Sequence, residues 1–462
     1  MENMKFDLLI KNGQVILPIG KKMVDIAVKD EKIALIGENL NVDVKEVVDA
    51  SGKIVLPGAI DVHTHLAMPF GGTISADDYF TGTRAALCGG TTSIIDYPCQ
   101  RAGKSIKETL APRFEMCEKD ACCDYSFHCA ITNFNDGKIL EEMDEACESG
   151  ITSYKGYMVY KKEGMMVDDG MIYQLLLRCK EVGAMLNLHA ENPDIIDVRT
   201  EQFLKEGKTS AWYHYLSRPE FVTAEADKRA VHWATHLNAP VYIVHMSDKE
   251  GLEAAIAAKK QGFDIKIETC PHYLEFTNEV FKRENGINFV CSPPMKGQDS
   301  LEALWKALND GYIDTVATDH CPFQQSEKLW GKDDFTKIPN GCAGIENMYP
   351  YMLSKANEGK TTYETVVRVC SYNPAKIFGC KDKGSLEVGK DADIVIFDPK
   401  KEFVVSVKNM HSNYDHTIWE GFKCHGYVTS TYLRGHLVFK DGEFLGKQGF
   451  GKFIKRERYQ GK

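Results

Sequence analysis

Hydrophobic and polar positions follow two different patterns along the chain. Near both ends, short runs such as residues 7–11 and 392–396 alternate between the two kinds of residue and are separated by turns such as residues 12–13. A period of two that is broken by turn residues is typical of antiparallel strands. The N-terminal runs are too few to bury a core alone. We therefore predict that residues 1–54 and 381–445 fold together into one small β-sandwich.

Between the two ends, buried strand candidates alternate with segments of helical length that mix apolar and charged residues. This alternation is the signature of strand–helix units around a parallel sheet. The strand candidates are residues 55–65, 91–97, 125–131, 152–160, 184–190, 241–246, 265–270 and 314–319. Eight strands with intervening helices over roughly 300 residues predict a (β/α)8 barrel, also called a TIM barrel. We place this barrel within residues 55–380.

Composition and charge exclude several classes of function. The net charge of −10 is not the basic balance that nucleic-acid binding needs. No stretch reaches about 18 apolar residues, and residues 1–5 lack the basic region and apolar run of a signal peptide. The 15 cysteines are odd in number and irregularly spaced, which favours free thiols in a reducing compartment. We predict a soluble cytoplasmic protein with no nucleic-acid or membrane partner.

Two histidines one residue apart end the first strand of the predicted barrel. Because side chains alternate along a strand, His63 and His65 lie on the same face, together with Asp61. An isolated pair of this kind is more commonly packed or solvated than bound to metal. The reacting groups of such a barrel, however, sit at the C-terminal ends of its strands. The later strands deliver four further polar residues at or near those ends, namely Lys155, His189, His245 and Asp319.

This set of side chains predicts a metal site. Imidazole and carboxylate groups are the usual ligands of zinc and similar divalent ions. Four histidines and one aspartate exceed what one zinc ion with an open position needs, whereas two ions about 3.5–4 Å apart use them all. Lys155 would be repelled and desolvated beside two cations, and both effects lower the pKa of its amine. A neutral amine can react with carbon dioxide to give a carbamate, and each of its two oxygens can bind one ion.

The segments that contain these residues resemble the cyclic amidohydrolases of the amidohydrolase superfamily, and most of all the D-hydantoinase and dihydropyrimidinase group. They are residues 61–65, 153–160, 187–191, 243–247 and 317–322. The resemblance implies two divalent metal ions per subunit, zinc by preference, bridged by carbamylated Lys155. The implied ligands are His63, His65 and Asp319 for one ion and His189 and His245 for the other. It also implies a homotetramer in which the C-terminal arm, residues 446–462, packs against a neighbouring subunit.

The resemblance further implies a reaction. Hydroxide between the two ions would attack a carbonyl of a cyclic diamide, a 5-monosubstituted hydantoin or a dihydropyrimidine, and open the ring to an N-carbamoyl amino acid. Asp319 would take the proton and pass it to the leaving ring nitrogen. Tyr160 would bind the substrate and donate its phenol to the developing oxyanion. Ser292 and Asn340 fall where the family reads the amide edge of the ring with main-chain groups.

Two other kinds of function remain open. Dihydroorotases resemble this chain but place an arginine shortly after the two histidines to hold the substrate carboxylate, whereas residues 66–70 are apolar here. We therefore expect a neutral or apolar ring substituent. Leu66, Phe70 and Tyr157 are candidates for lining its pocket, and packing in the core is the alternative role for them. An allantoinase-like or dihydroorotase-like ring hydrolase is one alternative. A non-catalytic scaffold that resembles dihydropyrimidinase is the other.

Overall fold

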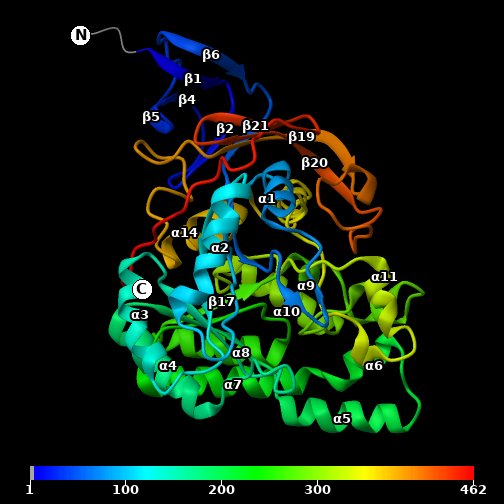
Figure 1. The fold of residues 1–462 in the computed structure, drawn as a ribbon. Helices are drawn as coiled ribbons and strands as arrows, with labels where there is room; N and C mark the ends of the chain where they lie inside the picture. The colour runs from blue at the N-terminus through cyan, green and yellow to red at the C-terminus, as the bar shows by residue number, and fades with distance from the viewer. Residues whose placement is uncertain (1–4, 462) are drawn as a thin grey trace.

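The computed structural model describes residues 5–461 of the 462-residue chain (Figure 1). Residues 1–4, which belong to the segment examined for a signal peptide, and residue 462, the end of the predicted arm, lie outside the described residues. Within the described part, none of the helices combines the length and the hydrophobicity that a membrane crossing needs.

Parallel strands form the barrel and follow one another around it in chain order. A first sheet contains β8 (Ala59–Thr64), β11 (Thr91–Asp96) and β12 (Asp124–Phe127). A second sheet contains β13 (Cys129–Ala130), β14 (Ser153–Tyr157), β15 (Met185–His189), β16 (Val241–Ile243), β17 (Ile265–Thr269) and β18 (Thr315–Val316). Parallel bridges from Thr64 to His320 and from Cys99 to Ala130 join the two sheets. The predicted (β/α)8 barrel is confirmed, with β12 and β13 sharing one position.

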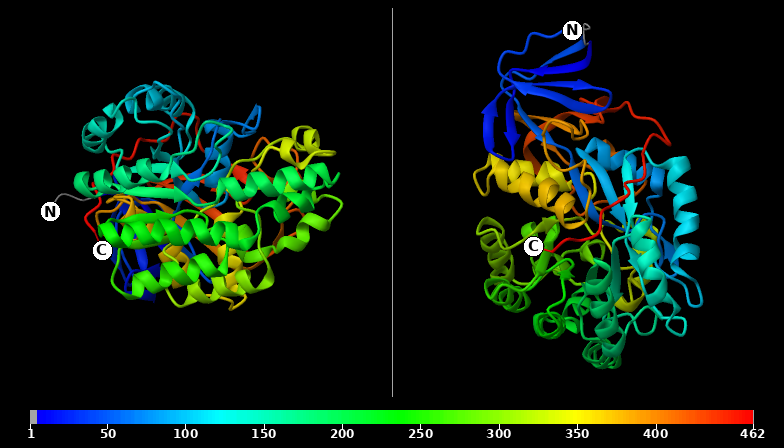
Figure 2. Two further views of the ribbon diagram at one scale, coloured as in Figure 1. Left: turned by 90° about the horizontal axis from the view of Figure 1, so that it is seen from below. Right: turned by 90° about the vertical axis from the view of Figure 1, so that its left-hand side faces the viewer.

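Helices surround the barrel strands, as Figure 2 shows. Those between successive strands are α1 (Tyr79–Cys88), α2 (Ile106–Asp120), α3 (Lys138–Glu148), α4 (Asp169–Val182), α7 (Glu220–Leu237), α8 (Lys249–Lys260) and α10 (Gln298–Asn309). The connection after β15 also contains α5 (Pro193–Lys205) and α6 (Ala211–Ser217), and α12 (Met348–Asn357) follows the last barrel strand. Several of these helices begin where a short polar side chain accepts a hydrogen bond from a backbone N–H of the first turn. The capping residues are Asp78, Ser105, Asp168 and Asp248.

Both chain ends form a two-sheet β-sandwich beside the barrel. One sheet has the order β5-β4-β1-β6, and the other has the order β22-β21-β20-β19-β7-β2-β3, so the second sheet mixes both ends of the chain. The strands are β1 (Phe6–Lys11), β2 (Gln14–Leu17), β3 (Gly20–Met23), β4 (Asp25–Lys29), β5 (Lys32–Gly37), β6 (Val44–Asp49), β7 (Ile54–Pro57), β19 (Ile394–Val404), β20 (Lys423–Leu433), β21 (His436–Lys440) and β22 (Glu443–Phe444). Alternate side chains such as Leu8, Ile26 and Ile394 pack in one buried cluster. The predicted sandwich is confirmed, and Figure 1 shows blue and red strands together above the barrel.

The strand that we predicted over residues 55–65 is two strands, separated by Gly58. β7 pairs with β19 and β2 in the sandwich, whereas β8 pairs with β11 in the barrel. The Gly58 N–H donates to the Asp393 carbonyl at 3.0 Å, and a Cβ atom at this position would overlap the Thr92 side chain. Both strands are buried, so their apolar pattern is continuous in the sequence. We propose that the barrel domain begins at Ala59.

The C-terminal arm lies against the barrel of its own chain. The Tyr125 N–H donates to the Lys452 carbonyl at 3.0 Å, and the Ile454 N–H donates to the Tyr125 carbonyl at 2.7 Å. The Arg456 guanidinium is buried and donates to the hydroxyls of Ser126 and Ser153, at 3.0 and 2.8 Å. Packing against a neighbouring subunit, which the family resemblance implied, stays a prediction.

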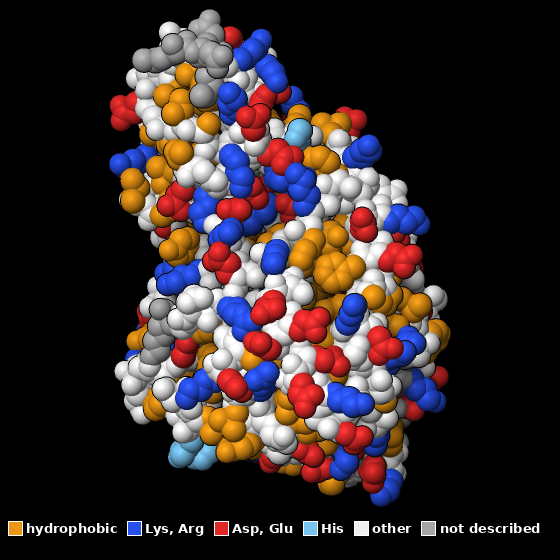
Figure 3. Space-filling model, turned by 60° about the vertical axis from the view of Figure 1, so that its left-hand side comes forward, with side chains coloured by type: hydrophobic (Ala, Val, Ile, Leu, Met, Phe, Trp, Pro, Cys, Tyr) orange, Lys and Arg blue, Asp and Glu red, His pale blue; other side chains and the backbone are white. Residues whose placement is uncertain are grey.

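Charged side chains are dispersed over the surface. Figure 3 shows basic and acidic groups interspersed over one face of both the sandwich and the barrel. The cysteines are free thiols, and all of them except Cys99 are buried. Burial in apolar surroundings raises the pKa of most of these thiols, for example that of Cys129, and this keeps them protonated.

Candidate active site

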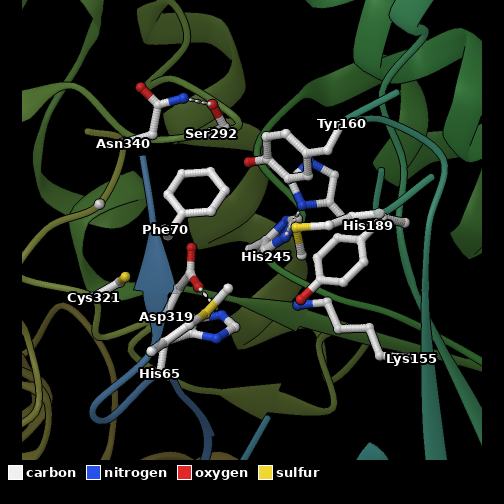
Figure 4. A pocket seen from close by; sticks show the side chains of 14 residues that line it. His65, Phe70, Lys155, Tyr160, His189, His245, Ser292, Asp319, Cys321 and Asn340 are labelled. Carbon is white, nitrogen blue, oxygen red and sulfur yellow. Dashed lines mark hydrogen bonds and ion pairs between the residues drawn. The ribbon is translucent and has the colours of Figure 1, made fainter. Parts of the chain in front are cut away.

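The predicted site residues meet in one cavity at the C-terminal ends of the barrel strands (Figure 4). Its lining contains His65, Met68, Phe70, Lys155, Tyr157, Tyr160, Met165, His189, His245, Ser292, Asp319, Cys321, Asn340 and Gly341. Of the nine residues that we predicted as metal ligands, catalytic residues or binders of the reacting amide, His63 alone does not line the cavity. It is fully buried, and its Nε2 atom lies 2.8 Å from the Lys155 amine. The structure therefore brings the whole predicted set together.

His63, His65 and Asp319 form the first group of potential metal ligands. The Nε2 atoms of the two histidines lie 3.2 and 3.1 Å from Oδ1 of Asp319. One ligand atom from each residue lies within 4.8 Å of the others. Burial raises the pKa of Asp319, but the rings of His63 and His65 outweigh it and hold that pKa well below its usual range. An ionised carboxylate and two imidazoles are a donor set that suits a divalent cation.

His189 and His245 form the second group. Nε2 of His245 lies 3.1 Å from Nδ1 of His189, so these two nitrogens face each other. The other ring nitrogen of His189 lies 2.8 Å from Glu191, which also accepts a hydrogen bond from Arg218 at 2.9 Å. Outer carboxylates of this kind orient metal-binding histidines. Burial lowers the pKa of both rings, so they are neutral and able to ligate.

Lys155 is a buried amine without an acidic partner. Its side chain is 1% exposed, and it forms no salt bridge with a carboxylate among residues 5–461. The amine lies 4.2 Å from the centre of the Tyr97 ring and within hydrogen-bonding distance of His63. Burial lowers the pKa of this amine. An unpaired ammonium in such surroundings costs several kcal/mol, so burial shifts the equilibrium of this amine toward its neutral, nucleophilic form.

Three site residues have an unusual backbone conformation. The φ angles of Tyr160, His245 and Asp319 are +67°, +39° and +50°. A left-handed conformation at a residue other than glycine costs about 1–3 kcal/mol and persists only where the surrounding structure imposes it. β16 ends at Ile243 and β18 at Val316, so His245 and Asp319 lie two and three residues beyond these strands. The strands that we predicted over residues 241–246 and 314–319 are therefore too long, although both residues lie near the strand ends as expected.

Tyr160, Ser292 and Asn340 also contribute polar groups to the cavity, and the Tyr160 ring lies 5.3 Å from the His189 ring. The Asn340 amide donates to the Ser292 hydroxyl at 3.1 Å. Figure 4 shows the Tyr160 hydroxyl directed into the space between this pair and Asp319. Burial raises the pKa of Tyr160, so its phenol stays protonated and remains a hydrogen-bond donor. These contacts place the three residues where a polar substrate group can reach them, and their roles stay predictions.

Comparison with known proteins decides the family. Residues 54–438 match the family model described as Amidohydrolase family. The chain belongs to this family. A D-hydantoinase from Geobacillus stearothermophilus is 40% identical over 457 residues, which cover 98% of this chain and 97% of that protein. The predicted family is confirmed.

Solved structures of other family members share the fold of this amidohydrolase over almost its whole length. The crystal structure of dihydropyrimidinase from Brevibacillus agri NCHU1002 has a TM-score of 0.95 at 39% identity and covers 98% of this chain and 99% of its own. The L-hydantoinase (dihydropyrimidinase) from Arthrobacter aurescens has a TM-score of 0.91 at 29% identity, with 98% and 100% covered. The barrel and the sandwich are therefore common to these enzymes.

The sequence analysis missed three charged residues that contact the predicted ligands of this amidohydrolase. Glu268 lies 2.6 Å from Nδ1 of His63 and accepts the His245 backbone N–H at 2.8 Å, while Glu191 and Arg218 support His189. Two signals were available in the sequence. A glutamate interrupts the buried strand β17, and Glu191 follows His189 by two residues.

Some neighbours have structural roles. We expected Leu66 to line the cavity, but it does not. It is fully buried and packs against Gly82 of α1. Asp61 accepts hydrogen bonds from the backbone N–H groups of His63 and Thr318, at 3.2 and 3.1 Å, and thereby ties β8 to the turn that carries Asp319. Burial raises the pKa of Asp61 to about 7.

Glu268→Gln should weaken metal binding about 10–100-fold, as loss of an outer carboxylate does elsewhere. Burial raises the pKa of Glu268 to about 8, yet three donors converge on its carboxylate, from His63, Tyr242 and the His245 backbone. A neutral amide can accept fewer of these hydrogen bonds, so the His63 ring loses its fixed orientation. Competition titration with a chelator measures the affinity. The exposed Glu253→Gln is the control and should leave it unchanged.

Proposed function

We propose that this amidohydrolase is a binuclear zinc enzyme that opens the ring of a cyclic diamide, a 5-monosubstituted hydantoin or a dihydropyrimidine, to give an N-carbamoyl amino acid. The observation that carries the proposal is the convergence of two ligand groups, a buried unpaired lysine and a protonated tyrosine on one cavity. The full-length relatives named D-hydantoinase and dihydropyrimidinase support this substrate class.

The donor set fits two divalent cations. His63, His65 and Asp319 would hold one, His189 and His245 would hold the other, and a carbamate on Lys155 would supply one oxygen to each. The fit rests on neutral imidazoles, an ionised carboxylate and an amine whose pKa burial lowers. When bound, such a pair of ions supplies hydroxide at neutral pH and polarises a carbonyl group.

The remaining steps fall to side chains of the chain itself. Asp319 would accept the proton of the attacking water and deliver it to the leaving ring nitrogen, which requires one carboxylate within reach of both. Tyr160 would donate its phenol hydrogen to the oxyanion that forms on the carbonyl. Ser292 and Asn340, which are hydrogen-bonded to each other, would bind the amide edge of the ring and hold it in one orientation.

The apolar side of the cavity would receive the substituent on the ring. Met68, Phe70 and Met165 line it together with Tyr157, and none of them carries a charge that could pair with a substrate carboxylate. Nearby, the rings of Phe70 and Tyr160 are 5.4 Å apart and make an edge contact. This environment favours a neutral or apolar substituent over an anionic one.

Phe70→Ala should lower kcat/KM for phenylhydantoin about tenfold or more while changing that for unsubstituted hydantoin much less. The reason is that the lost ring surface contacts the substituent and not the reacting amide. Steady-state kinetics on both substrates measures the difference. Phe70→Leu preserves most of the apolar surface and is the matched control. Equal losses on the two substrates would contradict this placement of the substituent.

A substrate panel tests the proposed function itself. Dihydrouracil, phenylhydantoin, allantoin and dihydroorotate are offered to the zinc-loaded enzyme, and the N-carbamoyl products are separated on a chiral column. We expect turnover of the first two. Faster turnover of dihydroorotate or allantoin would assign the chain to a related ring hydrolase. Absence of turnover on all four with both ions bound would favour the scaffold.

A further inference from the structure

A second cavity lies where the barrel helices meet the sandwich. It has a volume of about 260 Å³ and is bounded by the end of α1, the start of α12 and residues of β19, β20 and β21. None of the residues that line it lines the catalytic cavity. The proposed reaction therefore leaves this cavity without a role.

Three potential metal ligands converge on this cavity. They are Cys88 at the end of α1, Glu346 just before α12, and His411 in the segment between β19 and β20. One ligand atom from each lies within 4.8 Å of the others, and within residues 5–461 the His63, His65 and Asp319 group alone shares this property. Cys88 and Glu346 are each 5% exposed. Segments far apart in the sequence thus bring sulfur, oxygen and nitrogen donors to one buried point.

The second ring nitrogen of His411 and the second carboxylate oxygen of Glu346 already have hydrogen-bond partners within the protein. Nε2 of His411 faces the Gly442 carbonyl at 3.1 Å, and the second carboxylate oxygen of Glu346 accepts the His411 backbone N–H at 2.7 Å. Arg84 donates to the His411 carbonyl at 2.7 Å. Metal-bound histidines commonly donate the other ring N–H to a backbone carbonyl, which fixes the tautomer. The remaining atoms, Nδ1 of His411 and Oε1 of Glu346, form a hydrogen bond with each other at 2.6 Å. A bound metal ion would replace this hydrogen bond.

We propose that Cys88, Glu346 and His411 bind a zinc ion at the junction of barrel and sandwich. Thiolate, carboxylate and imidazole are all ligands of zinc, and bond lengths of about 2.0–2.3 Å place the ligand atoms of a tetrahedral site roughly 3.3–3.8 Å apart. The separations in the structure run from 2.6 Å between His411 and Glu346 to at most 4.8 Å, and they bracket that spacing. The charges also balance, because one thiolate and one carboxylate neutralise a divalent cation, so no net charge is buried.

The fourth coordination position opens into the cavity. The cavity volume of about 260 Å³ is large enough to hold several water molecules. Asn347 also lines this cavity, is 3% exposed, and its amide nitrogen has no hydrogen-bond partner among residues 5–461. A ligand water of the zinc ion would give this amide a partner. The ion would then join α1 and α12 of the barrel to the sandwich segment that carries His411.

Cobalt substitution distinguishes this site from the catalytic one. The proposed catalytic ligands are nitrogen and oxygen atoms, so thiolate-to-cobalt charge transfer in the near ultraviolet reports Cys88. We expect the Co²⁺-loaded enzyme to show this band and Cys88→Ala to lose it together with one equivalent of metal. Cys424→Ala is the matched control, because Cys424 lines the same cavity but lies outside the ligand group. It should keep both the band and the metal.

The ring-opening activity of each variant serves as the control that the variant is correctly folded. Both variants should retain the activity of the parent enzyme, because neither cysteine lies in the catalytic cavity. Retention of the band and of the full metal content in Cys88→Ala would overturn the proposal. If Cys88→Ala does not fold, anomalous scattering at the zinc edge from crystals of the zinc-loaded parent protein decides the matter. A peak beside Cys88 and His411 supports the site, and its absence shows only the hydrogen-bonded Glu346–His411 pair.

Discussion

Lys155→Ala will lose its activity together with its metal. The variant lacks the amine that would carry the carbamate, so the two proposed ions would lose their shared ligand. Because the shift of the pKa of water from about 15.7 toward about 7 is then lost, turnover should fall about 10³-fold or more. Mass spectrometry of the purified protein measures the metal content, and hydrolysis of dihydrouracil measures turnover. Lys155 is already buried without a salt bridge, so the substitution removes no ion pair between side chains.

Chemical rescue separates a bridging role from a structural one. Acetate or propionate can occupy the space that the lysine side chain leaves and can offer two oxygens to the ions, so we expect partial recovery of both metal and activity. Lys155→Arg fills the space but carries a positive charge and cannot form a carbamate, so it should not be rescued. Full activity of Lys155→Ala without any added acid would rule out the bridge.

Tyr160→Phe should lower kcat about 10²–10³-fold and leave the metal content unchanged. One donor to an oxyanion is worth about 2.7–4 kcal/mol in the transition state, which corresponds to this loss. Burial raises the pKa of Tyr160, so the phenol is protonated throughout the working range and the loss should not vary with pH. Single-turnover kinetics on the metal-loaded variant measures the chemical step directly.

Tyr157→Phe is the matched comparison for Tyr160→Phe. Both tyrosines line the cavity, but the Tyr157 hydroxyl lies 3.6 Å from the Cys99 thiol and is already engaged there. Its removal should cost far less than removal of the Tyr160 hydroxyl. A rate for Tyr160→Phe equal to that of the parent enzyme would mean that Tyr160 only packs against Phe70 and His189.

The agreement between sequence and structure is strongest where a pattern repeats. The alternation of strands and helices predicted the barrel, and the period of two at both ends predicted the sandwich. The pattern failed at Gly58, because two successive buried strands read as one apolar run although they belong to different sheets. It also made the strands before His245 and Asp319 too long, because β16 and β18 end at Ile243 and Val316 and the two residues themselves adopt a left-handed conformation.

Outer contacts of the site were harder to predict than its ligands. His63 and His65 share a strand face by local geometry alone, and this is visible in the sequence. Glu268 is more than two hundred positions from His63, and only the closure of the barrel brings them within 2.6 Å. The junction cluster is similar, since Cys88, Glu346 and His411 belong to segments that meet only when the sandwich packs on the barrel.

The sequence by itself determined the kinds of element, their order and the chemical types available for catalysis, because side-chain periodicity and residue identity are local properties. Tertiary structure decided which charges are paired, which amines and rings have lowered pKa values, and how the segments after β16 and β18 direct His245 and Asp319 into the cavity. These depend on burial and on contacts between distant segments, since the cost of a buried charge is set by its neighbours in space.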